Sequence, residues 1–165
     1  MMNLKHFDYY LVLDLEATCC DKGSIARNQM EIIEIGAVMV DSTTLTIVDE
    51  FQTFVKPVRH PILTEFCTAL TSIAQTEVDR APTYPEASAM LKNWLSGYPN
   101  GVFGSWGDYD RKQLQLSSTP FSHCLSSHQS QTIVFRNPRL AKTIRHGKSL
   151  RTCGFTPRRN PSPRH

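Results

Sequence analysis

Two acidic pairs in the sequence have the spacing and surroundings to hold a divalent metal ion. The first pair, Asp14 and Glu16, lies two residues apart near the end of the apolar segment LVLDLEAT. In an extended strand, residues i and i+2 face the same side about 6.6 Å apart, so both carboxylates would be presented together. Like charges held this close repel, and Mg²⁺ or Mn²⁺, which prefer oxygen ligands, would remove that cost. The alternative is a solvated pair at an exposed strand end.

The second pair, Asp108 and Asp110, follows the short apolar segment GVFGS. Asp110 would reach the same metal ion if the strand before it lies next to the strand of the first pair. The alternative is that both aspartates cap the start of the next helix, a position that favours Asp. A metal ion held by carboxylates at strand ends polarises a phosphate and activates water, which is the chemistry of phosphodiester cleavage.

The elements that must position these acids alternate between strands and helices. Short helices are expected at residues 61–70 and 72–78, and the spacing of Thr83 and Glu86 is typical of a capping box that starts a longer helix. An apolar stripe predicts that one face of this helix, ending at Gly97, packs in the core; its members are Ala87, Met90, Leu91, Trp94 and Leu95. Apolar runs predict strands over residues 9–15, 31–40, 45–56 and 101–105, a hairpin turn at 42–44, and a last helix over 109–116. The order indicates an α/β fold with a mixed sheet flanked by helices.

Composition indicates an ordinary globular chain. Its 165 residues suit one domain, with 40% hydrophobic and 20% charged residues. No apolar run approaches the length of a membrane span, so we expect no membrane partner. Five cysteines without a CxxC pair predict free thiols in a reducing compartment, and hence a cytoplasmic protein.

Charge divides the chain into two parts. Residues 1–110 carry all 15 acidic residues and 7 of the 18 lysines and arginines, whereas residues 111–165 carry the other 11 and no acid. We therefore expect a core over residues 1–116 and a degenerate basic segment over 117–165 that ends in a disordered Pro/Arg tail. Such a basic segment binds phosphate backbones without sequence preference.

Four segments, in this order and spacing, resemble the DEDDh 3′–5′ exonucleases, in the KapD-like branch of histone-mRNA and small-RNA exonucleases. They are LVLDLEATCCDKG, EIIEIGAVMVD, FVKPVRHPILTEFCTALTSIAQTEVD and WGDYDRKQL, within about residues 8–116. The resemblance implies an RNase H-like fold and a metal-dependent enzyme that releases nucleoside 5′-monophosphates from 3′ ends of RNA or single-stranded DNA. It implies two Mg²⁺ or Mn²⁺ ions and no obligate protein partner.

The resemblance also assigns roles to individual residues. Asp14 would bridge the two ions, Glu16 would complete one site, and Asp110 would bind the other ion. Four residues would lie against the terminal nucleotide, although Trp106 also suits a core position; they are Glu16, Ala17, Thr18 and Trp106. Several others are interpreted as structural or packing residues, namely Glu34, Gln75, Cys19 and Cys20.

The third motif of the family is absent from this chain. That motif is a His followed five residues later by an Asp, which act as the general base and the fourth carboxylate. None of the six histidines has Asp at that distance, and no acidic residue follows Asp110. Loss of a general base costs about 10²–10⁴ in rate. We expect a weakened or inactive exonuclease; the alternatives are a catalytically dead nucleic-acid-binding remnant and a fragment without a stable fold. A disrupted reading frame would explain the missing acids.

Overall fold

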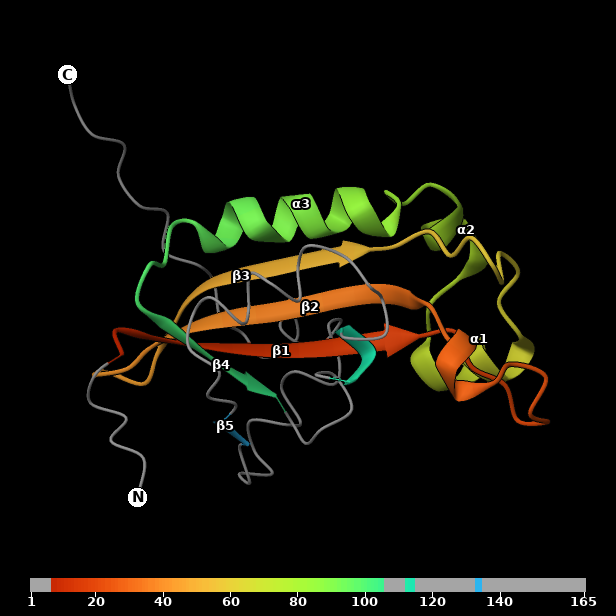
Figure 1. Ribbon diagram of the computed structural model, residues 1–165, viewed down its shortest axis with the longest axis horizontal. Coiled ribbons are helices and arrows are strands. Elements are labelled where there is room, and N and C mark those ends of the chain that lie inside the picture. Colours follow the sequence, from red (N-terminus) through yellow and green to blue (C-terminus); the bar gives the residue numbers. More distant parts are fainter. Residues whose placement is uncertain (1–6, 106–111, 115–132, 135–165) are drawn as a thin grey trace.

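The fold is built on one mixed sheet with helices on one face and at one end (Figure 1). The computed structural model describes residues 7–105, 112–114 and 133–134. The elements in chain order are β1 (Tyr9–Ala17), a short 3-10 turn (Arg27–Gln29), β2 (Ile32–Asp41), β3 (Ile47–Phe54), α1 (Glu65–Thr71), α2 (Gln75–Asp79), α3 (Tyr84–Leu95), β4 (Gly101–Ser105) and β5 (Ile133–Val134). No helix in these described ranges has the length and apolar character needed to cross a bilayer.

The strand order is β3-β2-β1-β4-β5, so the acid-bearing β1 lies in the middle of the sheet. β1 and β3 run antiparallel to β2, whereas β4 runs parallel to β1 and to β5. Antiparallel and parallel pairings in one sheet with flanking helices confirm the predicted α/β class. The parallel pairing also brings the carboxyl ends of β1 and β4 to the same edge, which is the condition set for a shared site.

The turn between β2 and β3 forms where it was predicted. Asp41 ends β2, and its Oδ1 accepts hydrogen bonds from the backbone N–H groups of Thr43 and Thr44 at 2.9 and 2.7 Å. An aspartate that bonds the backbone two and three residues ahead stabilises a tight turn. The hairpin therefore aligns β3 on the outer side of β2.

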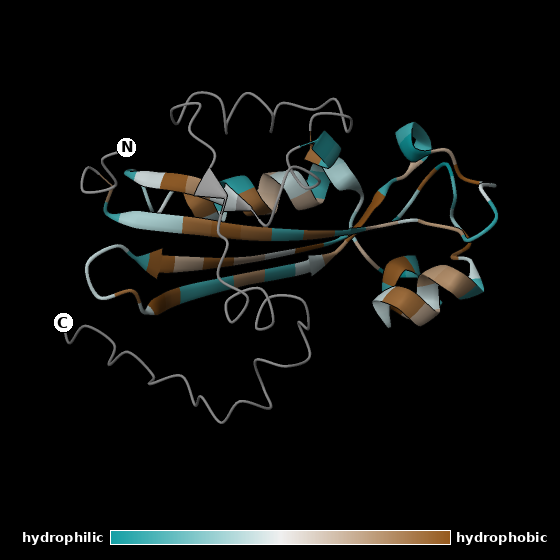
Figure 2. Ribbon diagram, turned by 90° about the horizontal axis from the view of Figure 1, so that it is seen from below, coloured by the Kyte–Doolittle hydropathy of each residue, from teal (hydrophilic) through white to brown (hydrophobic). Residues whose placement is uncertain are grey.

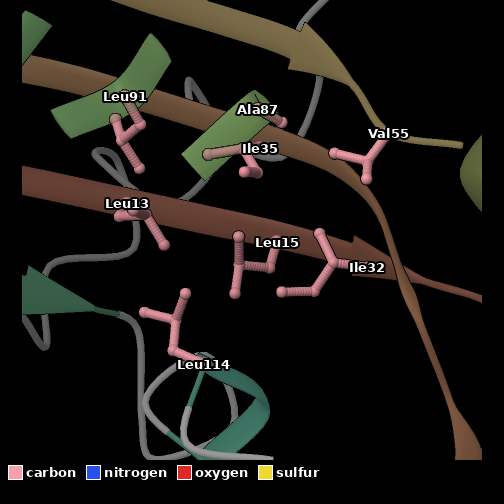
Figure 3. Close-up of a cluster of buried hydrophobic side chains, with 8 residues drawn as sticks. All are labelled: Leu13, Leu15, Ile32, Ile35, Val55, Ala87, Leu91 and Leu114. Atoms are coloured by element: carbon pink, nitrogen blue, oxygen red, sulfur yellow. The ribbon is translucent and has the colours of Figure 1, made fainter. Parts of the chain in front are cut away.

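The main core lies between α3 and the sheet (Figure 3). Leu13 and Leu15 of β1 point into it and are 1% and 4% exposed, whereas Asp14 and Glu16 between and after them are half-buried. Figure 2 shows that the strands are largely hydrophobic along their length. The alternation along β1 confirms that its leucines and its acids take opposite faces.

The packing of α3 agrees with the predicted stripe except at Met90. Ala87 and Leu91 are fully buried, but Met90 is 48% exposed and Ser88 is buried instead. The buried face of α3 is centred on Ala87, Ser88 and Leu91, which lie three to four residues apart. Met90 falls on the solvent edge of that face, so its assignment to the core was wrong.

The predicted starts and ends of the helices needed correction. α1 begins at Glu65 rather than at residue 61, because the Thr64 hydroxyl caps it by accepting from the Cys67 N–H at 3.0 Å. It ends at Thr71, and its C-cap Ser72 has a left-handed φ of 61°, so α2 begins only at Gln75 rather than at residue 72.

The longer helix starts and stops where it was predicted. The capping box is confirmed, because Glu86 Oε2 accepts from the Thr83 N–H and hydroxyl, both at 2.7 Å. α3 ends at Leu95 with Ser96 as its C-cap, so Gly97 is the first residue beyond the helix. A backbone bond from the Ser96 N–H closes the last turn.

Candidate active site

The candidate site starts from Asp14 and Glu16 near the carboxyl end of β1. Across the β1–β2 pair, Asp14 lies opposite Gly36 and Glu16 lies opposite Glu34. Directly opposed residues share one face of the sheet, so three carboxylates and one glycine gather on the face turned away from Leu13. Because the residue opposite Asp14 has no side chain, this part of the face keeps space beside the Asp14 carboxylate.

Glu34 is tied to the neighbouring strand. Its Oε1 accepts a hydrogen bond from Gln52 Nε2 of β3 at 2.5 Å. Like charges directly opposed on two strands are destabilising, and this bond gives the Glu34 carboxylate a neutral partner on the side away from Glu16. The contact agrees with a structural role for Glu34, as the sequence indicated.

The chain on both sides of the second acidic pair lies beside β1. Ser105, the last residue of β4, pairs with Leu13. Residues 112–114 are helical, and Leu114 is buried in the core cluster of Leu13 and Leu15. The two predicted site residues in between, Asp110 and Trp106, lie outside the described residues, so their places in the site stay predictions.

The described residues supply two of the three predicted metal ligands. In residues 7–105, 112–114 and 133–134 no group of three or more possible ligands from His, Cys, Asp and Glu comes together. Asp14 and Glu16 offer carboxylate oxygens only, which is the donor chemistry of Mg²⁺ and Mn²⁺ rather than of softer metals. The donor set therefore fits the expected ion, provided that a third carboxylate joins it.

The end of β1 is clamped to its surroundings. The register shifts between Glu16 and Ala17, and the Thr18 N–H then donates to the Glu31 carbonyl at 2.8 Å. In return, the Glu31 N–H donates to Thr18 Oγ1 at 2.9 Å. Ala17 and Thr18 are 5% and 1% exposed. Their side chains therefore pack inside the protein, and their predicted contact with a nucleotide stays a prediction.

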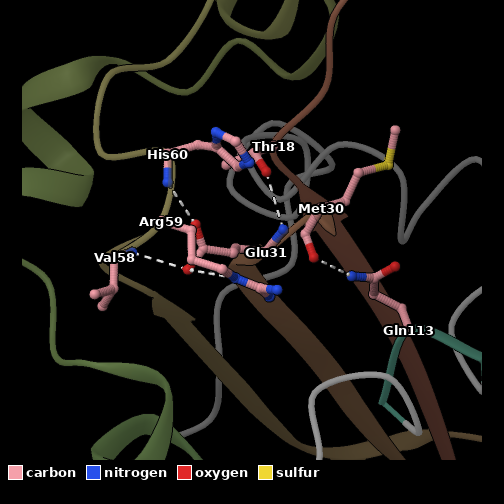
Figure 4. A network of polar contacts seen from close by, with 7 residues as sticks. All are labelled: Thr18, Met30, Glu31, Val58, Arg59, His60 and Gln113. Carbon is pink, nitrogen blue, oxygen red and sulfur yellow. Dashed lines mark hydrogen bonds and ion pairs between the residues drawn. The ribbon is translucent and has the colours of Figure 1, made fainter. Parts of the chain in front are cut away.

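Glu31 forms a junction between three segments (Figure 4). Its carboxylate accepts from the backbone N–H groups of Val58 at 2.9 Å and His60 at 2.7 Å, and Arg59 Nε lies 3.7 Å from it. Burial raises the pKa of Glu31, but the backbone N–H groups of residues 58–60 and the Arg59 charge outweigh it and hold the pKa below its ordinary value. The carboxylate is therefore charged and well satisfied at neutral pH.

A second contact at this junction reaches the helical residues after Asp110. Gln113 is 2% exposed, and its Nε2 donates to the carbonyl of Met30 at 3.0 Å. Sequence analysis did not single out Gln113 or Glu31. The partners of these two side chains lie 27 to 83 residues away, and local spacing carries no signal for such contacts.

The two cysteines after Thr18 differ in their surroundings. Burial, with a hydrogen bond to the neighbouring Cys67 thiol, raises the pKa of Cys19 to about 12. Hydrogen bonds from Ser24 and the Ile25 N–H lower the pKa of Cys20. A thiol as hard to ionise as Cys19 is no nucleophile at neutral pH, which agrees with its interpretation as a packing residue.

An apolar cavity lies at the other end of the sheet. Its volume is about 310 Å³, and its lining includes Leu11, Met39, Tyr98 and Phe103. Leu11 precedes Thr18 by seven residues, roughly 23 Å along an extended strand. The cavity is therefore separate from the carboxylates of the candidate site.

Comparisons with known proteins identify the family of this chain. The exonuclease family model (RNase_T) matches residues 11–143. Mouse 3'-5' exoribonuclease 1 is 40% identical over 97 residues, which are 59% of this chain and 28% of that protein. Bovine ERI1 exoribonuclease 3 is 39% identical over 116 residues, which cover 67% of this chain and 34% of that protein. The chain thus matches about a third or less of these relatives' length.

Solved structures agree with the sequence relatives. The nuclease domain of 3'hExo, a DEDDh family member bound to rAMP, superposes with a TM-score of 0.62 at 33% identity and covers 70% of this chain and 62% of that one. A 3'-exonuclease in a structure of histone mRNA stem-loop recognition gives 0.61 at 34% identity, over 68% of this chain and 42% of that one. The matched fold, the acidic strand end and the family model lead to one conclusion: this chain belongs to the exonuclease (RNase_T) family, among the DEDDh 3′–5′ exonucleases.

Proposed function

We propose that this chain acts as a metal-dependent 3′–5′ exonuclease that releases nucleoside 5′-monophosphates from the 3′ ends of RNA or single-stranded DNA. One observation carries the proposal. β4 runs parallel to β1, with Ser105 beside Leu13, so the chain that leads into Asp110 leaves the sheet next to Asp14 and Glu16. Asp110 at this edge would complete a three-carboxylate site.

In this proposal Asp14, Glu16 and Asp110 hold Mg²⁺ or Mn²⁺. Such an ion lowers the pKa of bound water and polarises the phosphate. The protein's own contribution is to hold the carboxylates in place. The buried leucines on the opposite face of β1 and the Thr18–Glu31 clamp at its end restrict their movement.

The proposed activity is weaker than that of relatives with a complete third motif. No acidic residue follows Asp110, so a second ion would lack its fourth carboxylate. Proton transfer would also lack a positioned histidine, a loss of about 10²–10⁴ in rate. The alternative is a nucleic-acid-binding protein without catalysis, and the 11 basic residues of the acid-free segment 111–165 favour it.

We propose that RNA is the preferred substrate. The two solved structures named above are described with rAMP and with a histone mRNA stem-loop. We also propose that the protein works in a reducing compartment such as the cytoplasm, because Cys19, Cys20 and Cys67 are free thiols. Cell fractionation checks the location.

The test is cleavage of 5′-labelled single-stranded RNA and DNA by the full chain with Mn²⁺. Asp14→Asn is the decisive variant because it keeps the shape of the side chain and removes its charge. Glu50→Gln on β3 is the matched control, since Glu50 is an exposed carboxylate outside the proposed site. We expect stepwise shortening that requires Mn²⁺, disappears in Asp14→Asn and persists in Glu50→Gln. Equal shortening in both variants would refute the proposal, and salt-sensitive binding without shortening would establish the alternative.

A further inference from the structure

The loop of residues 57–60 stands next to the candidate site, and neither the metal ligands nor the core explain its exposed residues, Val58 and Arg59. We propose that this loop is a phosphate-binding arm for the nucleic-acid strand whose 3′ end enters the site, with Arg59 as its cation and Glu31 as the residue that positions it. The inference rests on the proposed function, because it assumes a nucleic acid at the end of β1.

Glu31 fixes the loop through its backbone. Each carboxylate oxygen accepts one backbone N–H, Oε1 from Val58 at 2.9 Å and Oε2 from His60 at 2.7 Å. The Glu31 side chain itself is 13% exposed, so its carboxylate depends on these two bonds for much of its solvation. A buried carboxylate without them would be costly. The loop therefore has one conformation rather than many.

Arg59 remains accessible in that conformation. Its Nε lies 3.7 Å from Glu31 Oε1, beyond hydrogen-bond distance, and the side chain is 55% exposed. A guanidinium has five N–H donors in a planar fork, which suits two oxygens of one phosphate. The charge of Glu31 is already balanced in part by two backbone N–H groups, so the arginine keeps much of its attraction for an anion.

The chain segment around Arg59 is basic. Residues 51–64 include Lys56, Arg59 and His60 but no acidic residue. Val58 and Ile62 in the same stretch are 72% and 73% exposed, an unusual fraction for aliphatic side chains. Cations alternating with exposed apolar groups match the alternation of phosphates with sugars and bases in a single strand. A protein partner would bury the apolar groups, but it would gain less from the cations than a nucleic acid with its phosphates.

The arm borders the acids of the candidate site. Thr18 and Glu31 are joined by two hydrogen bonds, at 2.8 and 2.9 Å, and Figure 4 shows Thr18 and the loop on two sides of Glu31. Thr18 follows Glu16 by two residues, roughly 6.6 Å in extended chain. A strand whose 3′ end lies at Glu16 would therefore pass the loop within its last few nucleotides.

The experiment is equilibrium binding of fluorescein-labelled single-stranded RNA to the full chain over a series of salt concentrations. All proteins carry Asp14→Asn so that no cleavage intervenes. Removal of one phosphate contact lowers the slope of log affinity against log salt by about 0.7 for single strands. We expect that decrease for Arg59→Ala, and recovery of the slope in Arg59→Lys.

Two further variants make the result specific. Lys92→Ala removes an exposed cation that lines the cavity at the far end of the sheet, so we expect no change in slope. Glu31→Gln keeps Arg59 but loosens the loop, so we expect weaker binding with the slope retained. An Arg59→Ala slope equal to the parent's, or a decrease of the same size in Lys92→Ala, would overturn the arm.

These outcomes are independent of the nuclease proposal. If the unaltered chain shows no cleavage that depends on Asp14, the activity is refuted, but the salt slopes of the Asp14→Asn proteins can still be measured. If the salt slope of Arg59→Ala equals the parent's, and the chain without substitutions still cleaves RNA, the phosphate-binding arm is refuted and the nuclease proposal is not. A pull-down in which Val58→Ser and Ile62→Ser abolish a protein complex but leave RNA affinity unchanged would assign the surface to a protein partner instead.

Discussion

Substitution of Gly36 should make the protein more stable and its metal binding weaker. Gly36 lies in the middle of β2, directly opposite Asp14. A Cβ atom added there would meet the Asp14 carbonyl oxygen at 3.8 Å, which is ordinary van der Waals contact. Gly23 is the glycine with left-handed φ among the described residues, so Gly36 has a backbone that other residues adopt. Neither Gly36→Ala nor Gly36→Val should strain the fold.

The expected stability gain follows from the unfolded chain. A protein with glycine inside a strand is less stable than the same protein with alanine there by about 0.5–1 kcal/mol. For a chain of this length, 1 kcal/mol shifts Tm by about 2–4 °C. Gly36→Ala should therefore raise Tm by about 1–4 °C, and the β-branched side chain of Gly36→Val should preserve or extend the gain.

Metal binding should change in the opposite direction. The new side chain stands about 4.5–5.5 Å from the Cβ of Asp14, on the same face. An ion on Asp14 needs water or phosphate oxygens at about 2.1 Å on its other sides, and the added methyl groups occupy part of that space. We expect the loss of one such oxygen contact to cost about as much as the loss of a hydrogen bond to a charged group. That cost is about 1.5–3 kcal/mol, or roughly 10- to 150-fold in Mn²⁺ affinity.

Calorimetry with Mn²⁺, together with thermal melts, tests both effects on the same samples. Gly101→Ala is the matched control, because Gly101 pairs with Tyr9 at the other end of β1 and an added Cβ meets its neighbours at 3.5 Å or more. We expect a graded loss of Mn²⁺ affinity from Gly36→Ala to Gly36→Val and none in Gly101→Ala. Undiminished Mn²⁺ affinity in a folded Gly36→Val protein would show that the ion does not use this face of Asp14.

Three further predictions concern stability and reactivity. Leu91 is fully buried in the core, so Leu91→Ala should cost about 2–5 kcal/mol in urea unfolding, and a cost below 1 kcal/mol would contradict the packing of α3. The pKa of Glu31 is lowered by folding, so its stabilisation is present above the unfolded pKa and lost as the pH falls through the folded pKa. The stability difference between the unaltered chain and Glu31→Gln should therefore shrink from neutral pH to about pH 4, and a constant difference would exclude the linkage. Iodoacetamide at pH 8 should modify Cys20 well before Cys19, whose pKa is raised to about 12; peptide mass spectrometry reads the order, and equal rates would contradict these environments.

The sequence predicts β1 to β4 because β1, β2 and β4 are apolar runs and β3 alternates between apolar and polar residues, but it gave no prediction of β5. The predicted strand over residues 9–15 and the observed β1, Tyr9–Ala17, start together. The structure carries β1 two residues further, since Glu16 and Ala17 find partners on β2 that a local pattern does not reveal. Long-range pairing decides the ends of strands, whereas hydrophobic pattern decides their centres.

Helix ends and helix faces were less accessible to sequence reasoning. The capping box of Thr83 is a local interaction and was predicted correctly. The start of α1 depends on a choice between Pro61 and Thr64, and Thr64 prevails because its hydroxyl also donates to the carbonyl of Cys19 at 2.6 Å. Met90 has the right spacing for the core, but it is 48% exposed, and the buried face of α3 includes Ser88 instead. In both cases the tertiary contact outweighs the local preference.

The strongest physical argument for a site is the change of residue type along one face of β1. Val12 on this face packs with Val38, its partner on β2, in a buried cluster. One step further along the same face the pair becomes Asp14 and Gly36, and then Glu16 and Glu34. Stability alone would favour a continued row of apolar pairs, because opposed carboxylates repel and a strand glycine costs about 0.5–1 kcal/mol. Acids and a glycine at these positions, at the edge that β4 also reaches, are therefore a costly choice for folding, and they are the residues that the proposed metal site would use, with Asp14 and Glu16 as ligands and Glu34 held by Gln52.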